Sequence, residues 1–394
     1  MAGVWTACGI SLAASWRLIG GVLESLVALA YRVPAFPRNI NAGIGAQPGR
    51  TDMSAQNIPF VELYAADRHK TVEYFTSSFG FQEMAVSESP RLSSSLLCQG
   101  QVRLIVSSGP ATESFVEEHG DGVADIALGC DDVPATAAAV VAAGGRVLPA
   151  DSGTTVVSGF GDVRHTLLEA KREGAGELPA DRTWTRLEPG TPAGGQPKAV
   201  LSLDHIAVCL DAGSLQDAVR YYIEGFGCER FYSEYVEVGT QAMDSVVVRS
   251  PSGGVTFTII EPDPSREPGQ IDGFLRRNSG SGVQHLAFLV DDIVAAVRNY
   301  RARGVEFLST PATYYEMLRE RIPSMADQIA NLSDTHVLAD CDEWGYLLQL
   351  FSRSPHERNT LFYELIQRRG AQGFGSANIR ALYEAVERER VASA

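Results

Sequence analysis

Two histidines interrupt apolar stretches of the sequence, and their placement points to metal chemistry. His285 lies in the stretch 280–292, and His205 lies in the stretch 203–210. Apolar runs of this length, each followed by aspartate, predict buried strands that end where a helix begins. One buried histidine is usually a packing residue, but two such strands supply a pair of candidate metal ligands.

A third donor is expected from an acidic residue on another interior strand. The run 360–366 is rich in β-forming residues and contains one carboxylate, Glu364. Such a carboxylate is costly to bury unless it is paired or bound to a cation. Two imidazoles and one carboxylate with open opposite positions are typical of non-haem Fe(II) oxygenases. The alternative is that both histidines are core residues and that Glu364 lies on an exposed edge strand.

An internal repeat indicates which elements carry these residues. The stretch 119–148 matches 280–308, and both read as strand, Asp-capped helix, glycine stop and strand. The stretch 58–81 matches 203–228, a strand followed by a helix. We therefore predict an α+β protein of two similar halves, each built from two modules of one strand, one helix and further strands.

The two halves differ at the candidate ligands. His285 aligns with Asp125, and His205 aligns with Phe60, so the amino-terminal half lacks a matching histidine pair. We expect a structural domain at 53–180 and a catalytic domain at 199–394. The segment 174–198 between them is rich in Gly and Pro, as linkers often are.

Composition excludes several classes of function. The 394 residues are enough for two domains, and the net charge of -15 with a pI near 5.0 argues against nucleic acid or an anionic membrane as partner. Six cysteines without paired spacing are typical of a reduced cytoplasm. Residues 1–52 contain an apolar run interrupted by Arg17 and Glu24, and we expect them to be a disordered extension without a functional role.

Three stretches, 282–285, 347–351 and 361–387, resemble the 4-hydroxyphenylpyruvate dioxygenase family. The likeness covers about residues 57–390. It implies paired βαβββ modules of the vicinal-oxygen-chelate (glyoxalase-like) fold and a carboxy-terminal helix that closes the site as a lid. It also implies one Fe(2+) per chain on His205, His285 and Glu364, the substrates 4-hydroxyphenylpyruvate and O2, and a possible homodimer.

The family has two chemistries, and the sequence resembles one of them more closely. Homogentisate-forming members typically read Phe-Pro-Ile-Asn-Glu-Pro where this chain has 257–262, and carry Phe in place of Ile379. Thr258, Ile260 and Ile379, with the stretches 241–245 and 159–163, resemble the 4-hydroxymandelate-forming branch, which serves antibiotic biosynthesis. Ile260 can only pack where an amide can form hydrogen bonds. Homogentisate formation in tyrosine catabolism is the alternative.

The resemblance implies no catalytic residue beyond the metal ligands, but it implies a set of substrate contacts. Ser245 and Gln270 can orient the phenol or carboxylate, and Phe351 can stack on the aryl ring. Each also has a purely structural interpretation, as a strand-face Ser, a surface Gln and a core Phe. The implied substrate-binding residues are Ser245, Thr258, Ile260, Gln270, Gln349, Phe351, Phe374, Asn378 and Ile379.

Two other classes share this scaffold. A ring-cleaving extradiol dioxygenase uses the same module type and a similar ligand set, but the stretch 373–387 argues against it. A metal-free binding protein has no need of three competent ligand residues, and all three are present.

Overall fold

The computed structural model describes residues 54–150, 153–170, 178–188 and 199–381. The predicted extension at 1–52 therefore lies outside the described residues. The described residues all belong to one compact unit. Within the described ranges, no helix is both long enough and apolar enough to span a membrane.

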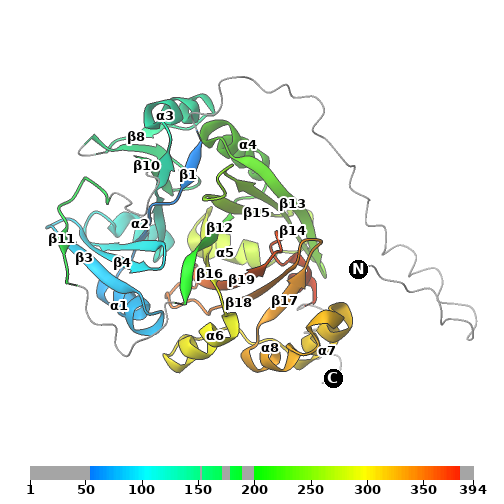
Figure 1. Cartoon of the computed structure of the whole chain (residues 1–394). Coiled ribbons are helices and arrows are strands. Elements are labelled where there is room, and N and C mark those ends of the chain that lie inside the picture. The colour runs from blue at the N-terminus through cyan, green and yellow to red at the C-terminus, as the bar shows by residue number, and fades with distance from the viewer. Residues whose placement is uncertain (1–53, 151–152, 171–177, 189–198, 382–394) are drawn as a thin grey trace, which may run out of the picture. The chain divides into compact units, whose positions relative to one another are not determined.

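The amino-terminal sheet contains two βαβββ modules joined by α2 (Glu113–His119) (Figure 1). The first consists of β2 (Val61–Tyr64), α1 (Arg68–Glu73) with η1 (Tyr74–Ser78), β3 (Gln82–Glu88), β4 (Ser93–Gln99) and β5 (Val102–Ser108). The second begins with a strand that is interrupted at Ala127, β6 (Gly122–Ile126) and β7 (Leu128–Cys130), and continues with α3 (Val133–Ala142), β8 (Val147–Leu148), β9 (Thr155–Ser158) and β10 (Arg164–Glu169). Two short strands lie at the ends of the sheet, β1 (Ala55–Asn57) and β11 (Thr185–Arg186).

The carboxy-terminal sheet repeats this plan. Its first module is β12 (Val200–Cys209), α4 (Leu215–Phe226), β13 (Glu229–Val238), β14 (Gln241–Arg249) and β15 (Thr256–Pro262). After α5 (Gln270–Asn278), the second is β16 (Gly282–Val290), α6 (Ile293–Ala302), β17 (Leu338–Cys341), β18 (Tyr346–Phe351) and β19 (Phe362–Arg369). The strand order is β13-β14-β15-β12-β16-β19-β18-β17. The predicted α+β fold with duplicated modules is confirmed.

Helix starts agree with the sequence, whereas one stretch after α6 does not. Asp132 and Asp292 cap α3 and α6 by accepting hydrogen bonds from the backbone N–H groups of Ala135 (2.8 Å) and Ala295 (2.9 Å). The strand expected at 305–308 is only a single bridge between Phe307 and Ser352. There the chain leaves the sheet for an insertion with no counterpart in the first half, α7 (Ala312–Arg321), η3 (Pro323–Met325) and α8 (Ile329–Thr335).

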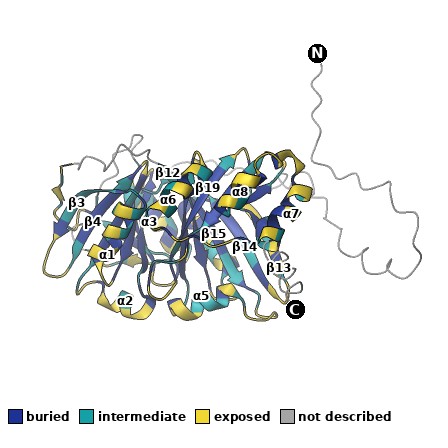
Figure 2. Ribbon diagram, turned by 90° about the horizontal axis from the view of Figure 1, so that it is seen from below, coloured by how far each residue is buried: buried dark blue, intermediate teal, exposed yellow. Residues whose placement is uncertain are grey.

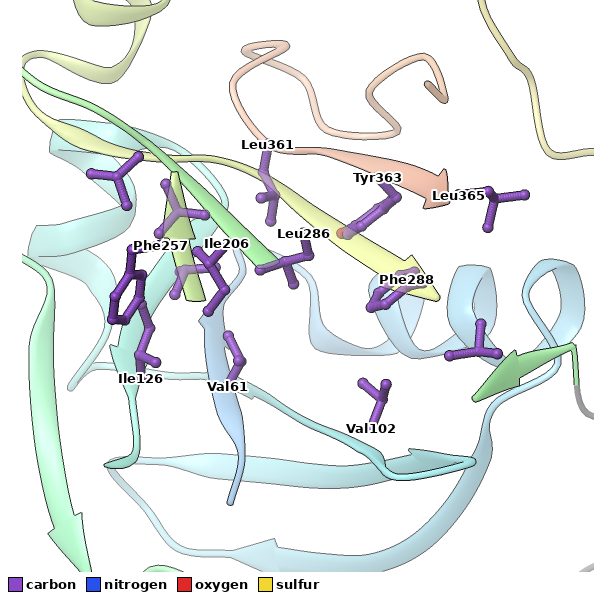
Figure 3. Packing of buried hydrophobic residues seen from close by; sticks show 14 of the residues in the cluster. Val61, Val102, Ile126, Ile206, Phe257, Leu286, Phe288, Leu361, Tyr363 and Leu365 are labelled. Atoms are coloured by element: carbon purple, nitrogen blue, oxygen red, sulfur yellow. The ribbon is translucent and has the colours of Figure 1, made fainter. Parts of the chain in front are cut away.

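Successive residues along a strand point to opposite faces of the carboxy-terminal sheet, and one of these faces packs into the hydrophobic core. Alternate residues of β12, β16 and β19 are almost fully buried in the core: Ile206, Val208, Leu286, Phe288, Tyr363 and Leu365. Val61 and Ile126 of the first sheet belong to the same hydrophobic cluster (Figure 3). Exposed residues gather on the outer sides of the helices (Figure 2). Burying each large apolar side chain contributes about 1.5–3 kcal/mol to the free energy of unfolding, so the core-facing side of the carboxy-terminal sheet stabilises the fold.

Three histidines form hydrogen bonds between the two halves. His165 Nε2 lies 2.8 Å from the hydroxyl of Tyr222 on α4. His119 Nδ1 donates to the carbonyl of Asn278 at 2.6 Å. His356 Nδ1 lies 3.2 Å from the Asp121 carboxylate. These contacts fix the packing of one half against the other at three separate points.

Candidate metal centre

The register of three adjacent strands brings the predicted ligands together. His205 on β12 pairs with Ala287 on β16, and Ala287 pairs with Glu364 on β19. Paired residues project on the same side of a sheet, and so does His285, two residues before Ala287. The side that does not face the core therefore carries two imidazoles and a carboxylate, and the small Ala287 side chain leaves space between them.

The three side chains point at one another. Glu364 Oε2 lies 3.3 Å from His205 Nε2 and 3.2 Å from His285 Nε2. One ligand atom from each residue lies within 4.8 Å of the other two, and the side chains are buried. Within the described residues, this is the group of His, Cys, Asp or Glu arranged closely enough to hold a metal ion. The donor set of two nitrogens and one oxygen fits a divalent transition metal such as ferrous iron.

Two irregularities in the β12–β16 ladder orient the imidazoles. The register shifts by one residue between Leu203 and His205 and again opposite Ala207, which makes Asp204 and Gln284 the extra residues of bulges. Bulges redirect side chains. Accordingly, His205 Nδ1 donates to Asp204 at 2.8 Å, and His285 Nδ1 donates to Gln284 at 3.2 Å. With each Nδ1 engaged, each Nε2 is directed at Glu364.

The electrostatics favour an ionised carboxylate. Burial opposes ionisation of Glu364, but hydrogen bonds and charges from the two histidines lower its pKa to about 2. Burial also opposes protonation of His205, but Asp204 and Glu364 raise its pKa to about 9. Burial lowers the pKa of His285. At neutral pH both ring nitrogens of His205 therefore carry a proton, and a bound cation would replace the proton on Nε2.

Aromatic rings surround the two imidazoles. The Phe374 ring centroid lies 5.2 Å from that of His205. Phe362 stacks on His285 at 5.0 Å, and Phe351 approaches the same imidazole edge-on at 5.8 Å. These rings give the centre an apolar boundary, which strengthens electrostatic interactions inside it.

Several predicted substrate residues share the ligand-bearing side of the sheet. Phe351 pairs directly with Glu364, and Gln349 lies two residues before it on β18. Thr258 and Ile260 pair with residues two and four positions after His205, and Ser245 pairs with Ile260. Thr258 Oγ1 and Gln349 Oε1 are buried without a hydrogen-bond partner. Because proteins rarely leave buried polar atoms unpaired, these two suit a polar ligand.

Ile260 and Ile379 meet in one apolar cluster although they are distant in sequence. The cluster also contains side chains from β12, β13, β14 and α5, including Cys209, Val236, Met243, Ile271 and Phe274. Ile379 belongs to the helical segment that begins at Ser376. Two of the three positions at which the sequence departs from the homogentisate-forming pattern, Ile260 and Ile379, therefore contribute to the same wall.

Two other predicted residues lie in different surroundings. Gln270 is exposed at the first position of α5. Asn378 is fully buried, and its Oδ1 accepts hydrogen bonds from Tyr314 (2.7 Å) and Arg321 (3.0 Å) on α7. Substrate contact by either residue stays a prediction.

The sequence interpretation missed one charged residue near the site. The guanidinium of Arg368 donates to both carboxylate oxygens of Asp204, at 2.7 and 2.8 Å. Arg368 follows Glu364 by four residues on one strand and so projects on the same side. That spacing, together with an aspartate directly before His205, was the available signal.

The corresponding region of the amino-terminal sheet holds ion pairs instead. Asp125, at the position of His285, contacts Arg164 at 2.9 Å, and Glu62 contacts Arg182 at 2.7 Å. Burial raises the pKa of Asp125 to about 6. Guanidinium groups from the protein itself thus neutralise the buried carboxylates of this half.

Comparison with known proteins agrees with this geometry. Residues 202–350 match the Glyoxalase/Bleomycin resistance protein/Dioxygenase superfamily. Over 84% of its length, the chain is 32% identical to 4-hydroxyphenylpyruvate dioxygenase of Yarrowia lipolytica, of which it covers 91%. The chain belongs to the 4-hydroxyphenylpyruvate dioxygenase family. It is also 34% identical to the Neurospora crassa member, with 70% of this chain and 71% of that protein covered.

Among solved structures, the chain is similar to a mutant of 4-hydroxymandelate synthase from Streptomyces coelicolor. The identity is 48% and the TM-score 0.77, with 86% of this chain and 100% of the other covered. The chain is therefore a dioxygenase, and its resemblance to 4-hydroxymandelate synthase is confirmed.

Proposed function

We propose that the enzyme converts 4-hydroxyphenylpyruvate and O2 into 4-hydroxymandelate and CO2, using one Fe(II) held by His205, His285 and Glu364. We choose this product because the chain is 48% identical to a 4-hydroxymandelate synthase, but only 32% and 34% identical to two 4-hydroxyphenylpyruvate dioxygenases. We choose iron because two imidazoles and a carboxylate on one side of the ion would leave its other coordination positions open for a chelating α-keto acid and O2.

Ferrous iron at this site would mediate electron transfer to O2. Two of the four electrons would come from the α-keto acid as it loses CO2, and the other two from the benzylic C–H bond. One oxygen atom enters the new carboxylate and the other becomes the benzylic hydroxyl, so the atoms balance. Glu364 contributes the negative charge that leaves the ligand set and iron near +1, which suits an anionic substrate. The rings of Phe351, Phe362 and Phe374 limit access of water to the reacting atoms.

The pocket wall would decide which carbon is oxidised. Ile260 and Ile379 offer no hydrogen bond to the phenol, so the substrate ring would be held by packing. Thr258 Oγ1 and Gln349 Oε1 remain available for polar substrate atoms. This combination supports an arrangement in which the benzylic carbon, and not the ring, lies nearest the iron.

We further propose a division of labour along the chain. Residues 199–394 would carry the reaction, with the helix that starts at Ser376 as a lid, and residues 53–180 would be structural. The ion pairs of Asp125 and Glu62 support this, because they occupy the region that corresponds to the metal ligands. A role in hydroxyphenylglycine and antibiotic biosynthesis would follow from the product.

Product analysis tests the proposal. The full chain is purified without oxygen, loaded with Fe(II), and supplied with 4-hydroxyphenylpyruvate and O2, and the aromatic product is identified by chromatography and mass spectrometry. We expect 4-hydroxymandelate. Homogentisate is the second candidate, favoured by the names of the fungal relatives, and as main product it would refute the proposed outcome. Absence of turnover with iron bound would refute the substrate.

A further inference from the structure

Arg368 connects the metal centre to the turn that leads into the terminal helix. Its Nε and Nη2 donate to the two oxygens of Asp204, which in turn accepts from His205 Nδ1. Its Nη1 donates to the carbonyls of Ala371 (3.2 Å) and Gly373 (2.7 Å). One guanidinium thus uses its planar fork on a carboxylate and its remaining nitrogen on the backbone.

The turn is held from its other side by Asp342. The carboxylate of Asp342 accepts from the backbone N–H groups of Gln372 (2.6 Å) and Gly373 (2.8 Å). The Arg368 guanidinium also lies 4.9 Å from the ring centroid of Phe374, and that ring contacts the His205 imidazole. The segment 371–374 therefore approaches His205 by two routes, through the Asp204 carboxylate and through the Phe374 ring.

We propose that Asp204 and Arg368 are positioning residues. They hold the His205 imidazole in its metal-binding orientation, and Arg368 connects it to the turn 371–374 that leads into the terminal helix. The inference rests on the proposed metal centre but not on the identity of the product. Asp204 fixes the proton on His205 Nδ1, which leaves Nε2 as the donor to a cation. Arg368 fixes Asp204, and the same guanidinium fixes the turn, so loss of Arg368 loosens both the ligand and the helix entry, whereas loss of Asp204 loosens the ligand.

The test compares Asp204→Asn, Arg368→Gln and the double variant in the full chain. The matched control is Arg369→Gln, because Arg369 is the next residue on the strand, is exposed, and pairs with Asp291. Affinity for Fe(II) is measured without oxygen by competition with a chelator. Hydrogen exchange of backbone amides in residues 371–381 is measured on the same samples by mass spectrometry.

We expect Asp204→Asn and Arg368→Gln each to weaken Fe(II) binding by about 10–100-fold, which is typical when the partner of a ligating histidine is lost. The double variant should bind about as weakly as the weaker single variant, since both substitutions break one chain of contacts. Arg368→Gln should also accelerate exchange in residues 371–381, and the control should change neither quantity.

Two results would overturn the inference. One is parent-like Fe(II) affinity, within about twofold, in a folded Arg368→Gln or Asp204→Asn variant. The other is full additivity of the two substitutions. Should Arg368→Gln fail to fold, Arg368→Lys is tested instead, because it keeps the positive charge but loses the planar guanidinium that donates to both oxygens of Asp204. Parent-like Fe(II) affinity in that variant would count equally against the inference. Homogentisate formation by a parent that binds iron would refute the proposed function and leave this inference intact.

Discussion

Replacing His165 with glutamine should remove a large part of the acid sensitivity of the fold. His165 is completely buried between the halves, where Nδ1 donates to the Ile126 carbonyl and Nε2 accepts from the Tyr222 hydroxyl. A neutral imidazole satisfies both contacts. Burial is the main cause that lowers the pKa of His165 to about 4, against an ordinary value of 6.5.

The sign and size of this effect on the free energy of unfolding follow from proton linkage. Below pH 6.5 the unfolded chain takes up a proton on His165, whereas the folded chain does so only near pH 4. The unfolded state therefore binds more protons in this window, and stability falls as the pH falls through it. The separation of the two values corresponds to a loss of about 3 kcal/mol by pH 4, with no contribution above about pH 7.

The assay is urea unfolding of the parent and His165→Gln between pH 7.5 and 4.5. The difference between the two free energies of unfolding is the informative quantity, because the raised pKa of Asp125 acts in the opposite direction in both proteins. That difference should shift by about 2 kcal/mol or more in favour of the variant as the pH falls. His69→Gln, at an exposed position on α1, is the control. Parallel curves for the parent and His165→Gln would refute the reasoning.

Three further substitutions test the site. Ile260→Asn should raise the proportion of ring-hydroxylated product seen by chromatography, and an unchanged ratio would count against the pocket wall. Glu364→Gln preserves shape but removes the ligand charge, so Fe(II) affinity should fall by about 100-fold or more in anaerobic chelator competition; near-parent affinity would contradict the ligand assignment. Ala287→Leu fills the space between the ligands, so it should abolish Fe(II) binding and cost about 1–3 kcal/mol in urea unfolding, and retained binding would show that this space is not needed.

Much of the centre could be predicted because its residues interrupt regular patterns. His205 and His285 stand out in buried strands, and a buried carboxylate such as Glu364 demands a partner. The duplicated modules were visible because both copies keep the same strand, Asp cap and glycine stop. Helix caps are local signals, and those at Asp132 and Asp292 hold in the structure.

The remaining features depend on information that hydropathy does not contain. A bulge breaks the two-residue alternation, but nearly every residue of β16 is buried, so hydropathy does not reveal the break and the bulge positions of Asp204 and Gln284 appear only in the strand register. The contact between Arg368 and Asp204 joins β19 to β12 and needs the same register. The insertion at 312–335 has no counterpart in the repeat, so alignment of the halves could not predict it.

The placement of all three proposed ligands on the hydrogen-bonded ladder of β12, β16 and β19 has a practical consequence. These strands lie in the middle of the sheet and their other faces belong to the core, so chain folding sets the ligand positions without help from an ion. Chains emptied by a chelator should keep the native fold, melt at a lower temperature because the free energy of metal binding is lost, and regain turnover when ferrous salt is restored. The specific activity of a preparation would then report the fraction of molecules that carry iron, and not the fraction correctly folded.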